Sequence, residues 1–307
     1  MINMISKIGI YVHKPRTIGN YIFKLVTYIL HKIRFNALTD RYVTQKDYKI
    51  VFGHALNLKA PESFNEKIQW LKLYDKSSLK TKCADKYAVR LFVKKTIGVK
   101  YLIPLHLSTQ NPDDISLQNL PESPVIVKTN HASGQVFVIK NKSSVNFAPI
   151  QDSLRFQLRS NFYHAHREWQ YKNILPRILV EKLLLDEDGK IPKDYKVHCF
   201  HGVPHYIQVD AERFSKHKRC IYDTNWKLLD IEYNKPQGDA TPRPTKLTEI
   251  LMLAQKLSKD FLYVRADFYQ VGEHVYFGEL TFTPEAGRGQ FLPFCKDAEW
   301  GKLIQLP

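Results

Sequence analysis

Apolar and polar residues alternate most clearly near the C-terminus, in the stretch VRADFYQVGEHVYFGELTFTP at residues 264–284. A period of two is typical of a β-strand, so the two alternating runs on either side of VGEH predict a β-hairpin. If the loop holds an odd number of residues, such as 272–274, Asp267 lies directly opposite Glu279 on one face. A loop with an even number of residues would place these two acids on opposite faces.

The charges in this hairpin need an explanation, because opposed carboxylates repel each other and destabilise a strand pair. In the same register Arg265 lies opposite Thr281. A shared cation would reverse the effect, and carboxylate oxygens with water and phosphate are the ligands that Mg²⁺ prefers. The alternative is a solvated hairpin face that carries unpaired acids.

The rest of the chain, from about Ala60, mixes helical and strand periods. Strands are predicted at 124–128, 136–140, 178–184, 195–200 and 205–210. Helices are predicted at 61–75, 85–98, 149–162 and 246–259, and Ser63 or Asn65 lies near the cap of the first. Helices mixed with antiparallel strands indicate the α+β class.

The N-terminal residues 5–35 are both apolar and basic, with a helix-like run from Tyr21 to Ile33. Lys24 and His31 interrupt this run, which falls short of the roughly 20 residues that a membrane span requires. No small-residue cleavage site follows, which argues against a signal peptide. The segment is either a core helix or a helix in the membrane interface with its basic side chains toward anionic lipid, and we favour the second interpretation.

Composition allows a sizeable core and indicates an anionic partner. The chain has 307 residues, of which 44% are hydrophobic, and a formal charge of +16. Such a surplus suits nucleotide phosphate, an acidic glycan or anionic lipid. Nucleic acid is disfavoured, because the basic residues are scattered and no nucleic-acid-binding motif is present. The four cysteines show neither CxxC spacing nor a disulfide framework, which fits the cytoplasm.

Two further stretches carry candidate chemistry. In PVIVKTNHASGQVFVIK, Lys128 ends an apolar strand and is followed by a small polar turn that contains Gly134; such a turn either cradles phosphate or only connects two strands. In ILVEKLLLDEDGKIPKDYKVHCFHG, Asp194 and Lys196 share one face of a strand. A zinc site is disfavoured there, because His198 and Cys199 point to opposite faces.

Several motifs occur together and in a fixed order: FNEKIQWLKLYD, DKYAVR, REWQYKNILPRI, DYKVHCFHG and FGELTFTP. In these motifs the chain resembles the TupA-like ATP-grasp family of bacterial polysaccharide gene clusters, from about Pro61 to the C-terminus. The resemblance implies an ATP-grasp fold, in which ATP lies between two α+β lobes. We therefore expect a basic amphipathic helical segment at 1–45 and a catalytic domain at 46–307, with lobes at about 80–182 and 183–307.

The resemblance also implies which residues surround the nucleotide and the metal. Those expected around ATP are Lys128 for the α- and β-phosphates, Ser133 and Gly134 for the loop closing over them, Glu181, Lys182 and Leu184 for the adenine, Asp194 for the ribose, and Lys196 for a phosphate contact with a catalytic role. Those expected at the transferred phosphoryl group are Arg265 as a catalytic residue, with Asp267, Glu279 and Thr281 as ligands of two Mg²⁺ ions. Many ATP-grasp ligases have Asn where this chain has Thr281.

The function that the resemblance implies is an ATP-dependent carboxylate–amine ligase that forms an acyl-phosphate and releases ADP and phosphate. Its setting would be the biosynthesis of capsule, O-antigen or a teichuronic-type polymer, in the cytoplasm or at the inner membrane surface. The expected partners are an acidic or amino-sugar glycan, or its nucleotide- or lipid-linked precursor, and an amino acid or other amine. A sugar phosphotransferase and a non-catalytic nucleotide-binding member of a polysaccharide assembly complex are the alternatives.

Overall fold

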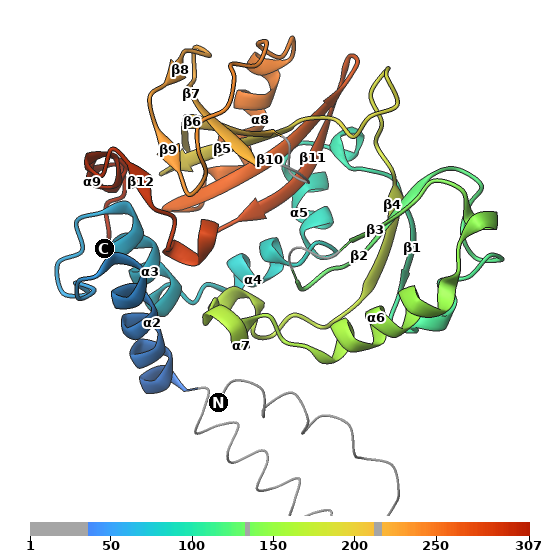
Figure 1. The fold of residues 1–307 in the computed structure, drawn as a ribbon, viewed down its shortest axis with the longest axis horizontal. Helices are drawn as coiled ribbons and strands as arrows, with labels where there is room; N and C mark the ends of the chain where they lie inside the picture. Colours follow the sequence, from blue (N-terminus) through green and yellow to red (C-terminus); the bar gives the residue numbers. More distant parts are fainter. Residues whose placement is uncertain (1–35, 133–135, 212–216) are drawn as a thin grey trace, which may run out of the picture. The chain divides into compact units, whose positions relative to one another are not determined.

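The computed structural model describes residues 36–132, 136–211 and 217–307 of the chain (Figure 1). The predicted helix within residues 5–35, and the residues Ser133 and Gly134, lie outside the described residues. By its internal packing the chain divides into two compact units, Met1–Val43 and Thr44–Pro307, and both large sheets belong to the second. Helix α2 spans Ala37–Phe52. None of the described helices combines the length and the apolar character needed to cross a membrane.

The first sheet has four antiparallel strands in the order β1-β4-β2-β3. Apolar side chains from alternate positions of β2 and β4 form a core beneath helix α6, and Leu154 of α6 is fully buried in it. The opposite face carries Lys128 and Glu181, because neighbouring residues in a strand point to opposite sides. The elements are β1 (Leu105–Thr109), β2 (Val125–Thr129), β3 (Val136–Ile139), β4 (Ile178–Lys182) and α6 (Phe147–Arg159).

The second sheet has six antiparallel strands in the order β11-β10-β5-β6-β7-β8. One of its faces is continuously apolar and packs with helices α8 and α5 into the largest hydrophobic core. The elements are β5 (Asp194–Phe200), β6 (Val203–Ala211), β7 (Lys218–Asp223), β8 (Leu228–Leu229), β10 (Tyr263–Val271), β11 (His274–Thr281), α5 (Val89–Thr96) and α8 (Leu247–Ser258).

The other face of this sheet changes character along the strands. At the end marked by Tyr263 it is covered by an aromatic core, in which the ring centroid of Phe64 lies 5.0 Å from that of Tyr263 and 5.4 Å from that of Trp300. Farther along, the same face is lined by charged side chains. The covering elements are α3 (Phe64–Tyr74), α9 (Cys295–Lys302) and the small sheet of β9 (Glu232–Tyr233) with β12 (Phe291–Leu292); the short helices α4 (Ser78–Ala84) and α7 (Tyr163–His166) complete the helices described.

The start of α3 follows directly from its sequence. Ser63 is the N-cap and accepts a hydrogen bond from the backbone of Glu66, whose side chain reaches back to the N-cap backbone. This reciprocal capping box satisfies two backbone donors that the first turn would leave unpaired. The predicted cap at Ser63 is confirmed, whereas Asn65 instead donates to the carbonyl of Gly289 at 2.8 Å.

The predicted hairpin is present as β10 and β11, and of the two alternatives for its loop the even one is observed. Val271 pairs with His274, so the loop holds only Gly272 and Glu273. A β-bulge at Gly278, which adds one residue to β11, restores the register, and Asp267 does lie opposite Glu279. The pairing expected for an odd loop therefore forms with an even loop, because the bulge supplies the extra residue.

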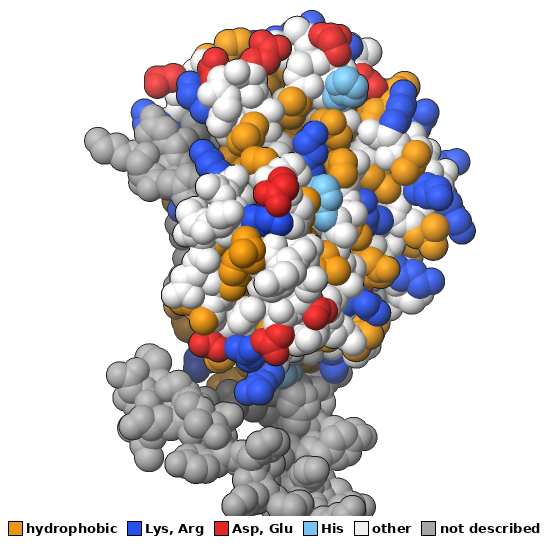
Figure 2. All heavy atoms as spheres, turned by 90° about the vertical axis from the view of Figure 1, so that its right-hand side faces the viewer, with side chains coloured by type: hydrophobic (Ala, Val, Ile, Leu, Met, Phe, Trp, Pro, Cys, Tyr) orange, Lys and Arg blue, Asp and Glu red, His pale blue; other side chains and the backbone are white. Residues whose placement is uncertain are grey.

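Positive charge is spread over the side of the molecule that Figure 2 shows. Figure 2 shows one side of the molecule, on which Lys and Arg side chains are interspersed with apolar ones and are not gathered into one patch. The mixture of helices and antiparallel sheets confirms the predicted α+β class.

We expect Gly278→Ala to lower the free energy of unfolding by about 1 kcal/mol or more, because overpacking a close contact forces the backbone to shift. A Cβ at Gly278 would lie 3.1 Å from the carbonyl oxygen of Asp267 and 3.1 Å from the ring of Tyr269. Gly272→Asn is the control in the same hairpin. The φ of Gly272, +52°, suits Asn, and the nearest atom to a Cβ at this position, Glu187 Oε1, would lie 4.0 Å away. Urea unfolding measures both, and equal stability of the two variants would contradict the bulge argument.

Candidate active site

Rows of polar side chains cross the face of the six-stranded sheet that lies opposite its apolar core. Residues directly opposite each other in antiparallel strands share a face, so the register sets these side chains side by side. The rows are Thr281–Arg265–His198–Tyr206, then Glu279–Asp267–Lys196–Gln208, then the pairs Tyr269–Asp194 and Asp210–Arg219. The residues expected at the transferred phosphoryl group therefore lie together on one surface.

Arg265 is buried and bonded to the opposed acids. Its Nε donates to Asp267 Oδ1 at 2.7 Å, and its Nη2 donates to Asp267 Oδ2 at 2.6 Å. The same Nη2 lies 3.4 Å from Glu279 Oε1 and donates to Thr281 Oγ1 at 3.1 Å. A two-pronged guanidinium–carboxylate contact is among the strongest charged hydrogen bonds. The cation that contacts both carboxylates in this structure is thus Arg265, which lies on the same strand as Asp267.

The second oxygen of Glu279 faces a lysine. Lys86 Nζ lies 3.6 Å from Glu279 Oε2 and also donates to the carbonyl of Ala132 at 2.8 Å. Lys86 precedes α5, and Ala132 is the last described residue after β2. This side chain therefore bridges the four-stranded sheet and the acidic end of β11.

The two opposed acids differ in their proton affinity. Burial raises the pKa of Asp267 to about 7; Arg265 acts against this rise, and the carboxylates of Asp194 and Glu279 add to it. For Glu279 burial also acts upward, but the cations Lys86 and Arg265 outweigh it and lower its pKa to about 2. Glu279 is consequently a full negative charge at neutral pH, while Asp267 depends on the positive charge beside it.

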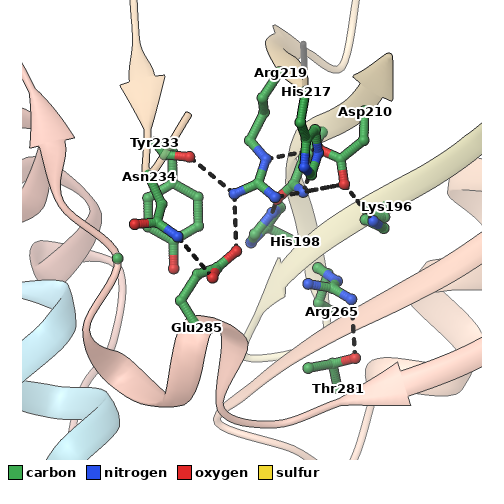
Figure 3. A network of polar contacts seen from close by, with 12 residues as sticks. Lys196, His198, Asp210, His217, Arg219, Tyr233, Asn234, Arg265, Thr281 and Glu285 are labelled. Atoms are coloured by element: carbon green, nitrogen blue, oxygen red, sulfur yellow. Dashed lines mark hydrogen bonds and ion pairs between the residues drawn. The ribbon is translucent and has the colours of Figure 1, made fainter. Parts of the chain in front are cut away.

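Lys196 belongs to a chain of charged contacts (Figure 3). Its Nζ lies 2.5 Å from Asp210 Oδ2 and 3.4 Å from Asp194 Oδ2. Asp210 Oδ1 accepts from Arg219 Nε at 2.7 Å, and Arg219 Nη1 donates to Glu285 Oε1 at 3.0 Å. Burial of Asp210 opposes its ionisation, but the two cations hold the pKa of this carboxyl far below its usual range. The chain of contacts links Lys196 on β5 to the segment that follows β11.

That segment has an unusual backbone conformation. Glu285 and Ala286 have left-handed φ angles of +51° and +54°, which cost an L-residue roughly 1–2 kcal/mol each. Gln69 of α3 donates to the carbonyl of Ala286 at 3.1 Å, and Asn234 donates to Glu285 Oε2 at 2.8 Å. Strained backbone that several partners hold in place is typical of functional sites.

A second cluster lies on the four-stranded sheet. Lys128 Nζ is 2.6 Å from Glu181 Oε2, and Arg90 Nη1 is 3.4 Å from Glu181 Oε1. The next residue along β4, Lys182, points to the opposite face and is exposed, and Leu184 is buried. The structure thus brings together the side chains of Lys128 and Glu181 but not that of Lys182.

His198 is fully buried between two polar partners. Its Nδ1 lies 2.8 Å from Tyr263 Oη and its Nε2 lies 3.2 Å from Gln208 Oε1. Burial holds the pKa of His198 well below its usual value, and the charge of Arg265 adds to this effect. Cys199 lies in the apolar core on the other face. Over the part of the chain that is described, no group of three or more His, Cys, Asp or Glu side chains is placed to hold a metal ion.

Comparison with known families decides the class of this protein. A sequence model of the family described as TupA-like ATP-grasp matches residues 66–305, which is most of the chain. The chain belongs to the TupA-like ATP-grasp family. The match starts within α3 and ends after α9, so it includes both sheets and the whole polar face. The resemblance seen in the sequence motifs and the ATP-grasp fold are confirmed.

Solved structures similar to this TupA-like ATP-grasp chain include two D-alanine–D-alanine ligases. The Bacillus anthracis enzyme is 19% identical, with 72% of this chain and 63% of that chain covered and a TM-score of 0.39. The Helicobacter pylori enzyme is 16% identical, with 78% of this chain and 65% of that chain covered and a TM-score of 0.41. An ADP complex of purK, N5-carboxyaminoimidazole ribonucleotide synthetase, is 13% identical, with 71% of this chain and 50% of that chain covered and a TM-score of 0.42. The chain thus spans less than two thirds of each of these structures, and no curated protein matches it significantly.

The polar face of this ATP-grasp chain fits a hard divalent cation. Asp267 and Glu279 are opposed across two strands, and Mg²⁺ commonly takes one or two carboxylates and completes its shell with water and phosphate. Thr281 adds a hydroxyl beside Glu279, at 3.1 Å from its Oε1. The side chain of Glu279 is 35% exposed while that of Asp267 is 3% exposed, so the pair is open on the side of Glu279.

Sequence reasoning missed several residues of this ATP-grasp site. Lys86 and Arg90 both lie in the motif DKYAVR, four residues apart, and this spacing was a usable signal because residues four apart are neighbours in the helix predicted at 85–98, although α5 itself begins only at Val89. Asp210 and Arg219 carried no such signal, because their pairing depends on the register of β6 with β7. Glu285 follows Pro284 in a segment whose sequence predicts only a turn.

We expect buried His198 to contribute a decrease in the free energy of unfolding between pH 7 and pH 5, because it stays neutral while the unfolded chain gains a proton; Asp267, whose pKa burial raises to about 7, contributes with the opposite sign over the same range. A histidine whose folded pKa is lowered loses stability below its unfolded pKa of about 6.5, by about 1.4 kcal/mol per pH unit. His198→Gln should make this decrease smaller, and His54→Gln, at an exposed position, should not. Urea unfolding at three pH values measures the slopes; equal slopes for His198→Gln and the wild type would contradict the assignment.

Proposed function

We propose that this protein is an ATP-dependent ligase that joins a carboxylate to an amine through an acyl-phosphate, in the biosynthesis of a surface polysaccharide. The observation that carries the proposal is the polar face of the six-stranded sheet. There an arginine, a lysine and two opposed acids, Arg265, Lys196, Asp267 and Glu279, lie in adjacent rows. Membership of the ATP-grasp family supports ATP as the phosphoryl donor.

For the nucleotide we propose the roles that the family resemblance implied. Lys128 would contact the α- and β-phosphates, and its ion pair with Glu181 fixes the direction of its side chain before ATP binds. Glu181 and Leu184 would lie at the adenine, where Lys182 would take part through its backbone because its side chain points to the other face of the sheet, and Asp194 would lie at the ribose. Lys196 would contact a phosphate, held in place by Asp210 at 2.5 Å.

At the transferred phosphoryl group we propose that Arg265 stabilises the developing negative charge, with Asp267, Glu279 and Thr281 as metal ligands. When bound, Mg²⁺ neutralises phosphate charge during such transfers. A guanidinium suits this task, because its planar donors match phosphate oxygens in pairs. Arg265 is 8% exposed, and a buried cation acts through a lower local dielectric than one in water.

The carboxylates of the polar face support a ligase over a sugar phosphotransferase. A sugar hydroxyl needs a general base, yet Asp210 is paired with Lys196 and Arg219, and Asp267 and Glu279 are the proposed metal ligands. Paired carboxylates are poor bases, because the neighbouring cation favours the ionised form. A carboxylate substrate needs no base, because it is already ionised at neutral pH.

For the substrates we propose an acidic or amino-sugar glycan, or its nucleotide- or lipid-linked precursor, and an amino acid or other amine. The formal charge of +16 suits an anionic glycan or lipid diphosphate. We place the reaction in the cytoplasm, with residues 1–45 at the inner face of the membrane.

Trapping with hydroxylamine tests the acyl-phosphate. We expect purified protein with ATP, Mg²⁺, hydroxylamine and a panel of uronic acids and amino acids to release ADP and phosphate and to form a hydroxamate. Glu279→Gln should abolish both products, because it removes the charge of a metal ligand. Glu273→Gln changes the same side-chain type in the turn of the same hairpin, where it is 78% exposed, and should leave both unchanged.

The outcome separates the alternatives. A γ-phosphate found stably bonded to a sugar would replace the ligase by a phosphotransferase. No ADP release with any member of the panel, in protein that binds ATP, would favour the non-catalytic nucleotide-binding role.

A further inference from the structure

Arg265 holds the same oxygen atoms that are proposed to bind the metal. It contacts both oxygens of Asp267, at 2.7 and 2.6 Å, and the hydroxyl of Thr281 at 3.1 Å. It also lies 3.4 Å from Glu279 Oε1, and Lys86 faces the remaining oxygen, Glu279 Oε2, at 3.6 Å. Every side-chain oxygen proposed for the metal therefore has a cationic group of the chain as a neighbour.

A divalent ion and the guanidinium cannot share these oxygens without repulsion. Mg²⁺ binds oxygen at about 2.0–2.1 Å, and its charge would lie beside Arg265 in a region where that side chain is 10% exposed. Moving Arg265 away leaves a largely buried cation without its carboxylate, which is strongly unfavourable. A bare metal ion therefore competes with an ion pair that the fold has already formed.

The local charge balance gives the same conclusion. Arg265 and Lys86 offset Asp267 and Glu279, so the group of four is neutral when Asp267 is ionised. A metal ion alone would add two uncompensated positive charges. A nucleotide brings phosphate oxygens that are acceptors for Arg265 and offset the charge of the metal.

We propose that Arg265 is a built-in counter-ion that keeps the metal site closed until nucleotide arrives, so that the divalent ion binds together with ATP and not before it. This inference rests on the proposed function, because it takes Asp267 and Glu279 as the metal ligands. Arg265 then has two successive partners: Asp267 in the free protein and a phosphate in the complex.

Binding of Mn²⁺ followed by electron paramagnetic resonance tests the inference without any catalytic readout. In the absence of nucleotide, we expect Arg265→Gln to bind Mn²⁺ at least about tenfold more tightly than the wild type, since close charge pairs couple by about 1.5 kcal/mol or more. Arg265→Lys keeps the positive charge, so its affinity for Mn²⁺ should increase much less. Arg219→Gln removes another buried arginine, which is paired with Asp210 on the same face, and should not gain affinity for Mn²⁺.

The wild-type protein alone can overturn the inference if Arg265→Gln does not fold. We expect its affinity for Mn²⁺ to rise sharply when a non-hydrolysable ATP analogue is added. Tight Mn²⁺ binding without nucleotide, or an equal gain in Arg219→Gln, would overturn the counter-ion role while leaving the metal site in place. No Mn²⁺ binding even with the analogue would overturn the metal site and, with it, the proposed function.

Discussion

The ion pair between Arg265 and Asp267 is the contact on which the polar face depends. Both side chains are buried, and a buried charge is tolerated only when a partner of opposite charge and hydrogen bonds compensate it. Their strand, β10, lies between β11 and β5. The pair therefore lies next to Glu279 on one side and Lys196 on the other. Loss of either charge would change the electrostatic environment of charged side chains on three strands.

Much of the fold could be predicted from local sequence patterns, and the exceptions have physical causes. The helix cap near Ser63 and the alternation in β10 and β11 are local, so they were recognised. The bulge at Gly278 was not, because a glycine in a strand is only a weak indication of a bulge. Strand β7 was missed because it contains Arg219, and a charged residue in a sequence pattern is taken as exposed. In the structure the ion pair with Asp210 allows the side chain of Arg219 to be buried.

The candidate site divides in the same way. Residues that lie in compact motifs, such as Asp267 and Glu279, were found because one hairpin brings them together. Lys86 reaches the site from a segment before α5, and Glu285 reaches it through two left-handed residues, so their places depend on tertiary packing. Lys182 shows the opposite case: it adjoins Glu181 in sequence but points to the other face of the sheet.

We propose that one surface of the six-stranded sheet binds the metal and the transferred phosphate, and that Arg265 changes partner between the free and bound states. A crystal structure with Mg²⁺ and a non-hydrolysable ATP analogue would show both. We expect Asp267 and Glu279 to bind the metal and Arg265 to have left Asp267 for the terminal phosphate. Nucleotide bound away from these residues, or bound with the Arg265–Asp267 contacts still at 2.6–2.7 Å, would contradict this proposal.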